Sequence, residues 1–249
     1  MIKGIYTSAL GLIPLQKRLE VIANNLANVN TTGFKRDDAF TNELISADSL
    51  FKNGSVDPSA SDLKEQTYTD FSQGPLEQTS NPLDVALSGQ GFFEVQTPNG
   101  AMLTRDGSFS LSIDGTLVTR NGDPVMGMNG PIRISDVQKM QTSQLVIGPD
   151  GTVKAGNQIY GQLRIVTPAN LSQLFKAGSN LYELNQGGTL EVVDPASTNV
   201  RQGYLEGSNV NPIDEMVAMI QLQSNFQAGQ KAIQTQDTSL NDANQVGQV

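Results

Sequence analysis

The sequence of 249 residues contains no cysteine, no histidine and no tryptophan. Without Cys or His, the chain has no thiol nucleophile and no Ser-His-Asp triad. It also lacks the usual nitrogen and sulfur ligands of zinc or copper, and an imidazole that exchanges protons near neutral pH. Any catalysis would therefore depend on carboxylates, Lys or Tyr.

Long hydrophobic runs and clustered positive charge are also missing. No segment approaches the 18 apolar residues of a membrane-spanning helix, and the first apolar stretch is broken by Gly11 and Pro14, so it is no secretory signal. The 16 basic residues are scattered among 25 acidic ones, for a net charge of −9. Because phosphate binding needs clustered Lys and Arg, we expect no nucleic acid partner, and we expect no insertion into a lipid bilayer.

Apolar residues at the start of the chain follow a helical period. Ile2, Ile5, Ala9, Leu12, Leu19, Ala23 and Leu26 alternate spacings of three and four, with Gln16 as the polar member of the series. Such a heptad stripe predicts an N-terminal helix in residues 1–36, ended by an Asn- and Thr-rich turn with a left-handed Gly33. Pro14 predicts a kink near Gly11, or a helix that begins at Pro14.

The other end of the chain, residues 206–249, predicts a second helix. Asn211 is a good N-cap, Pro212 suits the first helical position, and acidic residues follow where the helix dipole favours them. Met219, Phe226, Ile233 and Leu240 then recur at seven-residue intervals. This stripe is narrow, so the helix must be stabilised by packing against something else.

Between the helices, residues 37–79 have weak periodicity and are interpreted as an extended linker, while residues 80–205 predict an all-β domain. Asn99-Gly100, Asp106-Gly107, Asp114-Gly115, Asn121-Gly122 and Asp150-Gly151 mark tight turns. Strands are expected at 92–96, 102–105, 109–113, 117–120, 132–134, 145–147, 152–155, 160–166, 182–184, 190–193 and 200–205. One short helix is expected at 168–175.

The predicted fold class is α+β: a central domain of short antiparallel strands, flanked by N- and C-terminal helices that pair as a coiled coil. Such a pair would present further seams to neighbouring molecules. The candidate interface residues are Ile5, Leu12, Leu19, Leu26, Asn24, Asn28, Met219, Phe226, Ile233 and Leu240. For the asparagines the alternative is a role limited to the end of the helix.

Four strings together resemble the bacterial flagellar rod and hook proteins. The string from Val21 to Arg36 resembles the family's N-terminal helix and turn, and Asn81 to Phe93 with Thr104 to Phe109 resembles the opening of its β domain. Gly203 to Asn211 resembles the lead into its C-terminal helix. The chain is too short for a hook protein and too long for the small rod proteins. The short linker and the string from Leu205 to Asn211 favour the proximal-rod FlgF type over the distal-rod FlgG type.

The resemblance implies a structural subunit of the flagellar basal-body rod, which transmits torque from the motor to the hook. Its implied partners are copies of itself, other rod proteins, and the flagellar type III export apparatus, which would export it unfolded to the periplasm without a cleaved signal peptide. The terminal helices would form the inner wall of the rod and the β domain would face outward. No catalytic residue, cofactor or metal is expected.

Two other classes stay open from the residues alone. Asp84, Glu94, Asp106 and Asp114 could supply a carboxylate pair for glycan hydrolysis, although no aromatic platform accompanies them. A phage-tail-like fibre subunit would share the helical seams but not the four strings.

Overall fold

The computed structural model describes residues 2–41, 65–135, 145–185, 187–194 and 197–246. The chain divides into two compact units. The first, here called the helical unit, comprises Met1–Ala27, Arg36–Asp70 and Val210–Val249. The second, the β unit, comprises Asn28–Lys35 and Phe71–Asn209.

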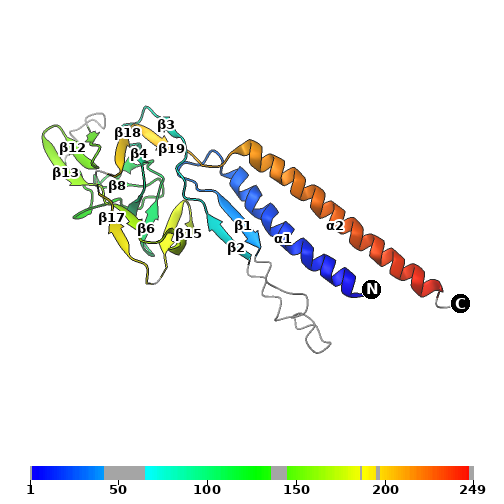
Figure 1. Cartoon of the computed structure of the whole chain (residues 1–249). Coiled ribbons are helices and arrows are strands. Elements are labelled where there is room, and N and C mark those ends of the chain that lie inside the picture. The colour runs from blue at the N-terminus through cyan, green and yellow to red at the C-terminus, as the bar shows by residue number, and fades with distance from the viewer. Residues whose placement is uncertain (1, 42–64, 136–144, 186, 195–196, 247–249) are drawn as a thin grey trace. The chain divides into compact units, whose positions relative to one another are not determined.

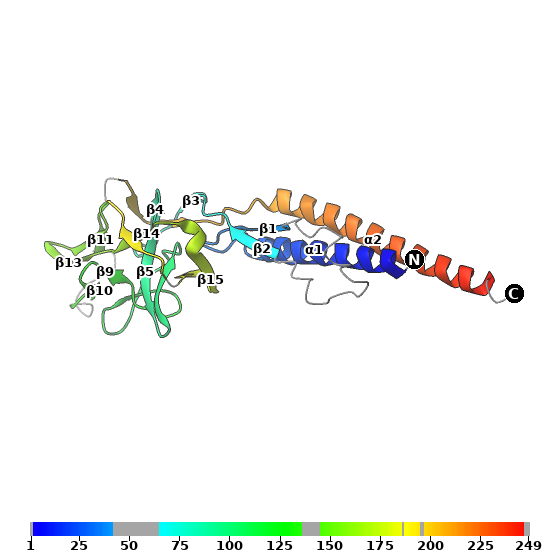
Figure 2. The ribbon, with the colours of Figure 1, turned by 60° about the horizontal axis from the view of Figure 1, so that its bottom comes forward.

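The helical unit contains two long helices and a β-ribbon. Helix α1 spans Ile2–Ala27 and helix α2 spans Pro212–Val246; the two lie side by side in opposite directions (Figures 1 and 2). The ribbon pairs β1 (Asp37–Thr41) with β2 (Glu65–Thr69) and contacts α1 through β1. These two strands lie within the segment expected as a linker, whose residues 42–64 fall outside the described residues.

The start of α2, the path of α1 through Pro14 and the turn after α1 each have an identifiable cause. The N-cap of α2 is confirmed, because Asn211 Oδ1 accepts a hydrogen bond from the amide of Ile213. Helix α1 continues through Pro14, so a helix that begins at Pro14 is wrong. The reason is that α1 contacts α2, and this packing outweighs the single backbone hydrogen bond that proline removes. Gly33 is left-handed as predicted, with φ +68°.

The β unit consists of antiparallel pairs. Its six-stranded sheet has the order β15 (Leu174–Gly178), β16 (Leu181–Leu184), β6 (Gly100–Thr104), β5 (Phe92–Thr97), β14 (Ile165–Pro168), β17 (Leu190–Val192). A three-stranded sheet joins β11 (Leu145–Ile147), β12 (Thr152–Ala155) and β13 (Gln158–Gln162). Two-stranded pairs are β4 (Val85–Ser88) with β18 (Asn199–Gln202), β3 (Leu76–Gln78) with β19 (Tyr204–Glu206), β7 (Ser110–Leu111) with β8 (Leu117–Val118), and β9 (Met126–Gly127) with β10 (Gly130–Pro131).

The core of the β unit lies on both faces of the six-stranded sheet. Neighbouring residues of a strand point to opposite faces, and on β5 Phe92 packs in one buried cluster with Tyr182 while Phe93 packs in the other with Phe109. The Phe93 and Phe109 rings meet edge to face at 5.1 Å. Burial on both faces explains why every residue of β5 except Gln96 is buried, including the polar Glu94 and Thr97.

Four predicted β-domain elements are wrong in detail. The expected strand 132–134 is not a strand, because only Arg133 pairs there, in an isolated bridge to Thr116. The expected strand 160–166 is divided between β13 and β14, which belong to different sheets. The expected strand 200–205 breaks at Gly203, whose φ of +75° separates β18 from β19. In place of the helix 168–175, the chain forms a 3₁₀ turn, η4 (Leu171–Gln173), and then enters β15, because Leu174 pairs with Leu184 of β16.

Candidate functional site

The inward face of α1 carries five large aliphatic residues. Leu12, Leu15, Leu19, Ile22 and Leu26 are half-buried and alternate spacings of three and four. The predicted members Leu12, Leu19 and Leu26 lie on this face, but Gln16 and Ala23 are exposed, so part of the predicted stripe is displaced by one residue. Ile5 lies in α1, and its side chain is outside the described residues.

The inward face of α2 has the same spacing. Six of its buried and half-buried positions alternate spacings of four and three, and we call them the α2 seam: Glu215, Met219, Leu222, Phe226, Gly229 and Ile233. Ala218, beside them, is also half-buried. The predicted residues Met219, Phe226 and Ile233 belong to it, whereas the side chain of Leu240 is outside the described residues. A Cβ atom at Gly229 would lie 2.6 Å from Leu12 Cδ2, so the two helices approach closely at this point.

A charged residue begins the α2 seam. Glu215 is 2% exposed, and its Oε1 accepts a hydrogen bond of 2.5 Å from Arg36 Nε. This hydrogen bond is the main reason that the pKa of Arg36 is raised, with burial opposing it. The Arg36 carbonyl accepts a hydrogen bond from the amide of Asp70, beside the β-ribbon.

Asn25 performs an intramolecular role that the sequence did not reveal. It is 1% exposed, its Nδ2 donates to the carbonyl of Asp37, and its Oδ1 accepts from the amide of Asp37. The side chain thus holds the start of β1 against the last turn of α1. Of the predicted asparagines, Asn24 is exposed, and Asn28 is half-buried with Oδ1 accepting from Thr31 Oγ1.

Apolar side chains also point away from the α2 seam. Ile213, Met216, Val217 and Ile220 are 66%, 46%, 48% and 63% exposed, and we call them the outward stripe. Their spacing of i, i+3, i+4 and i+7 places them on one face of the helix, about 150° from the seam at 3.6 residues per turn. That spacing is readable in the sequence. The outward stripe was not predicted as a separate face, because the seven-residue repeat that begins at Met219 dominates the periodicity of the same segment.

In the β unit, the carboxylate of Glu206 accepts hydrogen bonds from two positively charged side chains. Its Oε1 accepts from Lys35 Nζ at 2.5 Å and from the amide of Gly74 at 3.0 Å, and its Oε2 accepts from Arg105 Nη1 at 3.1 Å. Burial lowers the pKa of Arg105, and the charge of Glu206 opposes this shift. Lys35 Nζ also donates to the carbonyl of Ser72, so the residues after α1 are fastened inside the β unit.

Of the four carboxylates considered for hydrolysis, three contact a nearby polar or charged side chain and the fourth lies in a turn. Asp84 Oδ1 accepts from Asn81 Nδ2, Glu94 Oε2 lies 3.2 Å from Arg164 Nε, and Asp106 Oδ1 accepts from Thr32 Oγ1. Asp114 is exposed in the turn between β7 and β8.

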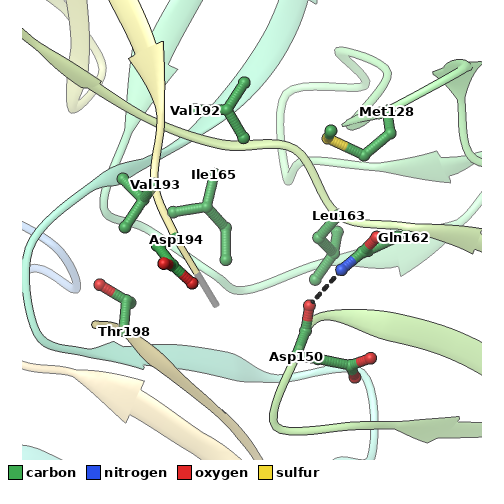
Figure 3. A pocket seen from close by; sticks show the side chains of 9 residues that line it. All are labelled: Met128, Asp150, Gln162, Leu163, Ile165, Val192, Val193, Asp194 and Thr198. Carbon is green, nitrogen blue, oxygen red and sulfur yellow. Dashed lines mark hydrogen bonds between the residues drawn. The ribbon is translucent and has the colours of Figure 1, made fainter. Parts of the chain in front are cut away.

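A cavity of about 90 Å³ in the β unit is lined by none of those four residues (Figure 3). Leu163, Ile165, Val192 and Val193 give it apolar walls, and Met128, Asp150, Gln162, Asp194 and Thr198 complete its lining. In Figure 3 the Gln162 amide points to the Asp150 carbonyl, which accepts its hydrogen bond at 2.8 Å. Ligand sites of drug size enclose roughly 300 Å³ or more, so this cavity is too small for a sugar chain.

The described part of the chain has neither a cluster of metal-binding side chains nor a membrane-spanning helix. No group of three or more acidic residues there lies close enough to hold a metal ion. Within the same residues, neither helix has a stretch apolar and long enough to cross a bilayer.

Three family models match successive parts of the chain. They are described as a flagella basal body rod protein, matching residues 5–35, a flagellar hook protein FlgE/F/G D1 domain, matching 86–155, and a flagellar basal body rod FlgEFG protein C-terminal region, matching 201–246. The first covers α1 from Ile5 onward and the third covers all of α2, so the two helices lie almost entirely in the regions that these models describe.

Curated relatives match nearly the whole chain. A flagellar basal-body rod protein FlgF of Caulobacter vibrioides is 33% identical over 92% of this chain and 91% of its own length. A FlgG of Bacillus subtilis is 35% identical over 97% of this chain and 98% of its own, and a FlgG of Buchnera aphidicola is 36% identical over 99% and 100%. These identities do not favour one type over the other.

Proposed function

Because the chain belongs to the flagellar basal-body rod family and is a structural subunit rather than an enzyme, we propose that it polymerises through its terminal helices to transmit torque from motor to hook. Its location is the flagellar basal body. In this proposal its neighbours are copies of itself and other rod proteins.

The outward stripe is the observation that supports this proposal most strongly. Ile213 and Ile220 expose about two thirds of their surface, although full burial of such a side chain is worth roughly 1.5–3 kcal/mol. The seam of α2 already faces α1, so the stripe is available to another molecule. A contact between a stripe and a different surface of the next copy is heterologous, and heterologous contacts build open helical filaments such as a rod.

The predicted interface residues then have two roles. We infer that Leu12, Leu19, Leu26, Met219, Phe226 and Ile233 pair the two helices as a coiled coil inside each subunit. The exposed Asn24, the half-buried Asn28 and the outward stripe contact neighbouring subunits. Pairing within the subunit is needed first, because a narrow seam does not hold an isolated helix.

The proximal-rod FlgF type is our proposal for the place of the subunit within the rod. It rests on the short linker between Phe34 and Asn81 and on the string from Leu205 to Asn211. The distal-rod FlgG type is the second candidate, since FlgG relatives match at equal identity. Labelling the subunit in isolated basal bodies distinguishes the two by its distance from the hook.

Export completes the proposal. A chain without cysteine cannot be trapped by disulfides while unfolded, which suits passage through the flagellar type III apparatus from the cytoplasm to the periplasmic rod without a cleaved signal peptide.

A deletion strain complemented with single variants tests the function. We expect deletion to abolish flagella while the inner-membrane base still forms, and Ile220→Asp to fail to restore swimming. The matched control is Gln221→Asp, which puts the same charge on the neighbouring exposed position outside the stripe. Normal swimming with Ile220→Asp, at normal protein levels, would show that the stripe is not an assembly surface.

A further inference from the structure

The α2 seam contains a single charged residue among its described positions, Glu215, and that residue is buried. The other positions are Met219, Leu222, Phe226, Gly229 and Ile233. Taking an ion pair out of water costs about as much as the attraction returns, and well-packed apolar residues of the same volume are often equally stable. Stability alone therefore gives no reason for a charge at this position.

The apolar residues that face each other on α1 and α2 do little to fix the register, that is, which residue of α2 lies opposite which residue of α1. On α1 the facing residues are four leucines and one isoleucine, nearly equivalent in size and shape, and they repeat every seven residues. A shift of α2 by one heptad would replace one apolar contact with another at most of these positions; Gly229, where Leu12 packs against bare backbone, is the exception. Repetitive seams of this kind are given a unique register in coiled coils by a buried polar or charged position.

Arg36 is fixed to α1 through a short chain of contacts. The backbone of its neighbour Asp37 exchanges two hydrogen bonds with the side chain of Asn25, in the last turns of α1. Arg36 itself donates to Glu215 in the first turn of α2. The contacts Asn25 to Asp37 and Arg36 to Glu215 thus join the end of α1 to the start of α2 at one defined place.

We propose that Arg36 is a positioning residue that sets the register of α2 on α1 through its ion pair with Glu215. The register decides the height along α1 at which the outward stripe is presented, so this inference rests on the proposed assembly function. In a shifted register, Arg36 faces an apolar seam residue and Glu215 loses its partner. Arg36 keeps Asp38, whose Oδ2 lies 3.7 Å from its Nη2, but Glu215 is then a buried carboxylate without its counter-ion, and this cost disfavours the shifted pairings.

Engineered cysteine pairs report the register directly, because the natural chain contains no cysteine. Leu12→Cys with Gly229→Cys reports the native register, since these positions meet in the structure. Leu12→Cys with Gln236→Cys, or with Leu222→Cys, reports a shift of seven residues in either direction. Each pair is oxidised in the full-length chain, and the disulfide yield is measured.

The decisive background is the double variant Arg36→Met with Glu215→Leu, which removes both charges and keeps apolar volume. We expect it to keep the thermal midpoint of the parent, to lose native-pair crosslinking at least fivefold, and to gain one of the shifted pairs. The charge-swapped variant, Arg36→Glu with Glu215→Arg, should return the native pair. A merely structural ion pair would lower the midpoint without changing which pair forms.

Two outcomes overturn the inference: native-pair crosslinking that is unchanged in the double variant, or a charge swap that behaves like the double variant. Swimming of the same strains tests the proposed function separately. If the register shifts and the cells still swim normally, the role of Arg36 in register stands and the assembly role of the stripe fails.

Discussion

Lys35 Nζ lies 2.5 Å from Glu206 Oε1, and both side chains are completely buried. This ion pair connects the string that follows α1 with the string that precedes α2, inside the β unit. Gly33 strengthens the same connection, because its amide donates to the Glu206 carbonyl at 2.7 Å. The two most family-like strings of the sequence therefore have a structural reason to occur together.

Removing one member of this buried cluster should be severe. Glu206→Gln leaves Lys35 and Arg105 without a full counter-charge, and we expect a loss of roughly 3–5 kcal/mol in the free energy of unfolding of the β unit. Lys35→Met should cost a similar amount. Urea denaturation followed by circular dichroism measures both. The control Lys154→Met changes an exposed lysine of β12 and should cost almost nothing; equal costs for Lys35→Met and Lys154→Met would contradict the cluster's role.

Asn25→Ala should destabilise the helical unit. The substitution removes two part-buried hydrogen bonds between the Asn25 side chain and the Asp37 backbone, each worth about 0.5–1.5 kcal/mol. Hydrogen exchange at the Asp37 amide should accelerate strongly. Asn24→Ala, an exposed change one residue away, serves as the control. Unchanged exchange at Asp37 would show that its amide is protected by something other than Asn25.

Gly33→Ala combines two costs. The left-handed conformation costs an L-residue roughly 1–2 kcal/mol, and the new Cβ would lie 2.5 Å from the amide nitrogen of Asp106. Gly156→Ala provides the comparison, since Gly156 has a similar left-handed φ of +58° but has open space around it. We expect the larger loss of thermal stability for Gly33→Ala. The reverse order would mean that the close approach to Asp106 is readily relieved.

Asp150 should titrate below the usual range of an aspartate. Hydrogen bonds from the Thr152 hydroxyl and then from its amide lower the pKa of Asp150. Because the pKa is depressed in the folded state, the resulting stabilisation is complete above the unfolded value near 3.9 and is lost as the pH falls through the folded value. Thr152→Val should raise the pKa of Asp150 in an NMR titration, whereas Thr167→Val in β14 should not.

Sequence reasoning reached the helices and the fold class because periodicity and capping are local signals. The Asn211 cap, Gly33 and the Asn99-Gly100 turn between β5 and β6 could all be read from neighbouring residues. The sheet to which each strand belongs could not be predicted in this way, since the division of residues 160–166 between two sheets depends on partners far along the chain. The roles of Asn25 and Glu215 depend on β1 and Arg36, so no local pattern marked them.

The candidate site was partly predicted for the same reason. The seven-residue repeat of Met219, Phe226 and Ile233 correctly identified an inward face of α2. It could not say whether that face is filled by α1 or by another molecule, because this requires the tertiary structure. Once α1 lies against the seam, the outward stripe is the apolar face of α2 that is still exposed.

The most direct test of the account is photo-crosslinking from the outward stripe in assembled basal bodies. A photoreactive phenylalanine analogue replaces Met216, and the same analogue at Gln221, outside the stripe, is the control. The account predicts that position 216 gives a covalent adduct with a second rod subunit in isolated basal bodies and that position 221 gives much less. Basal bodies that contain the labelled chain but yield no rod-subunit adduct from position 216 would contradict it.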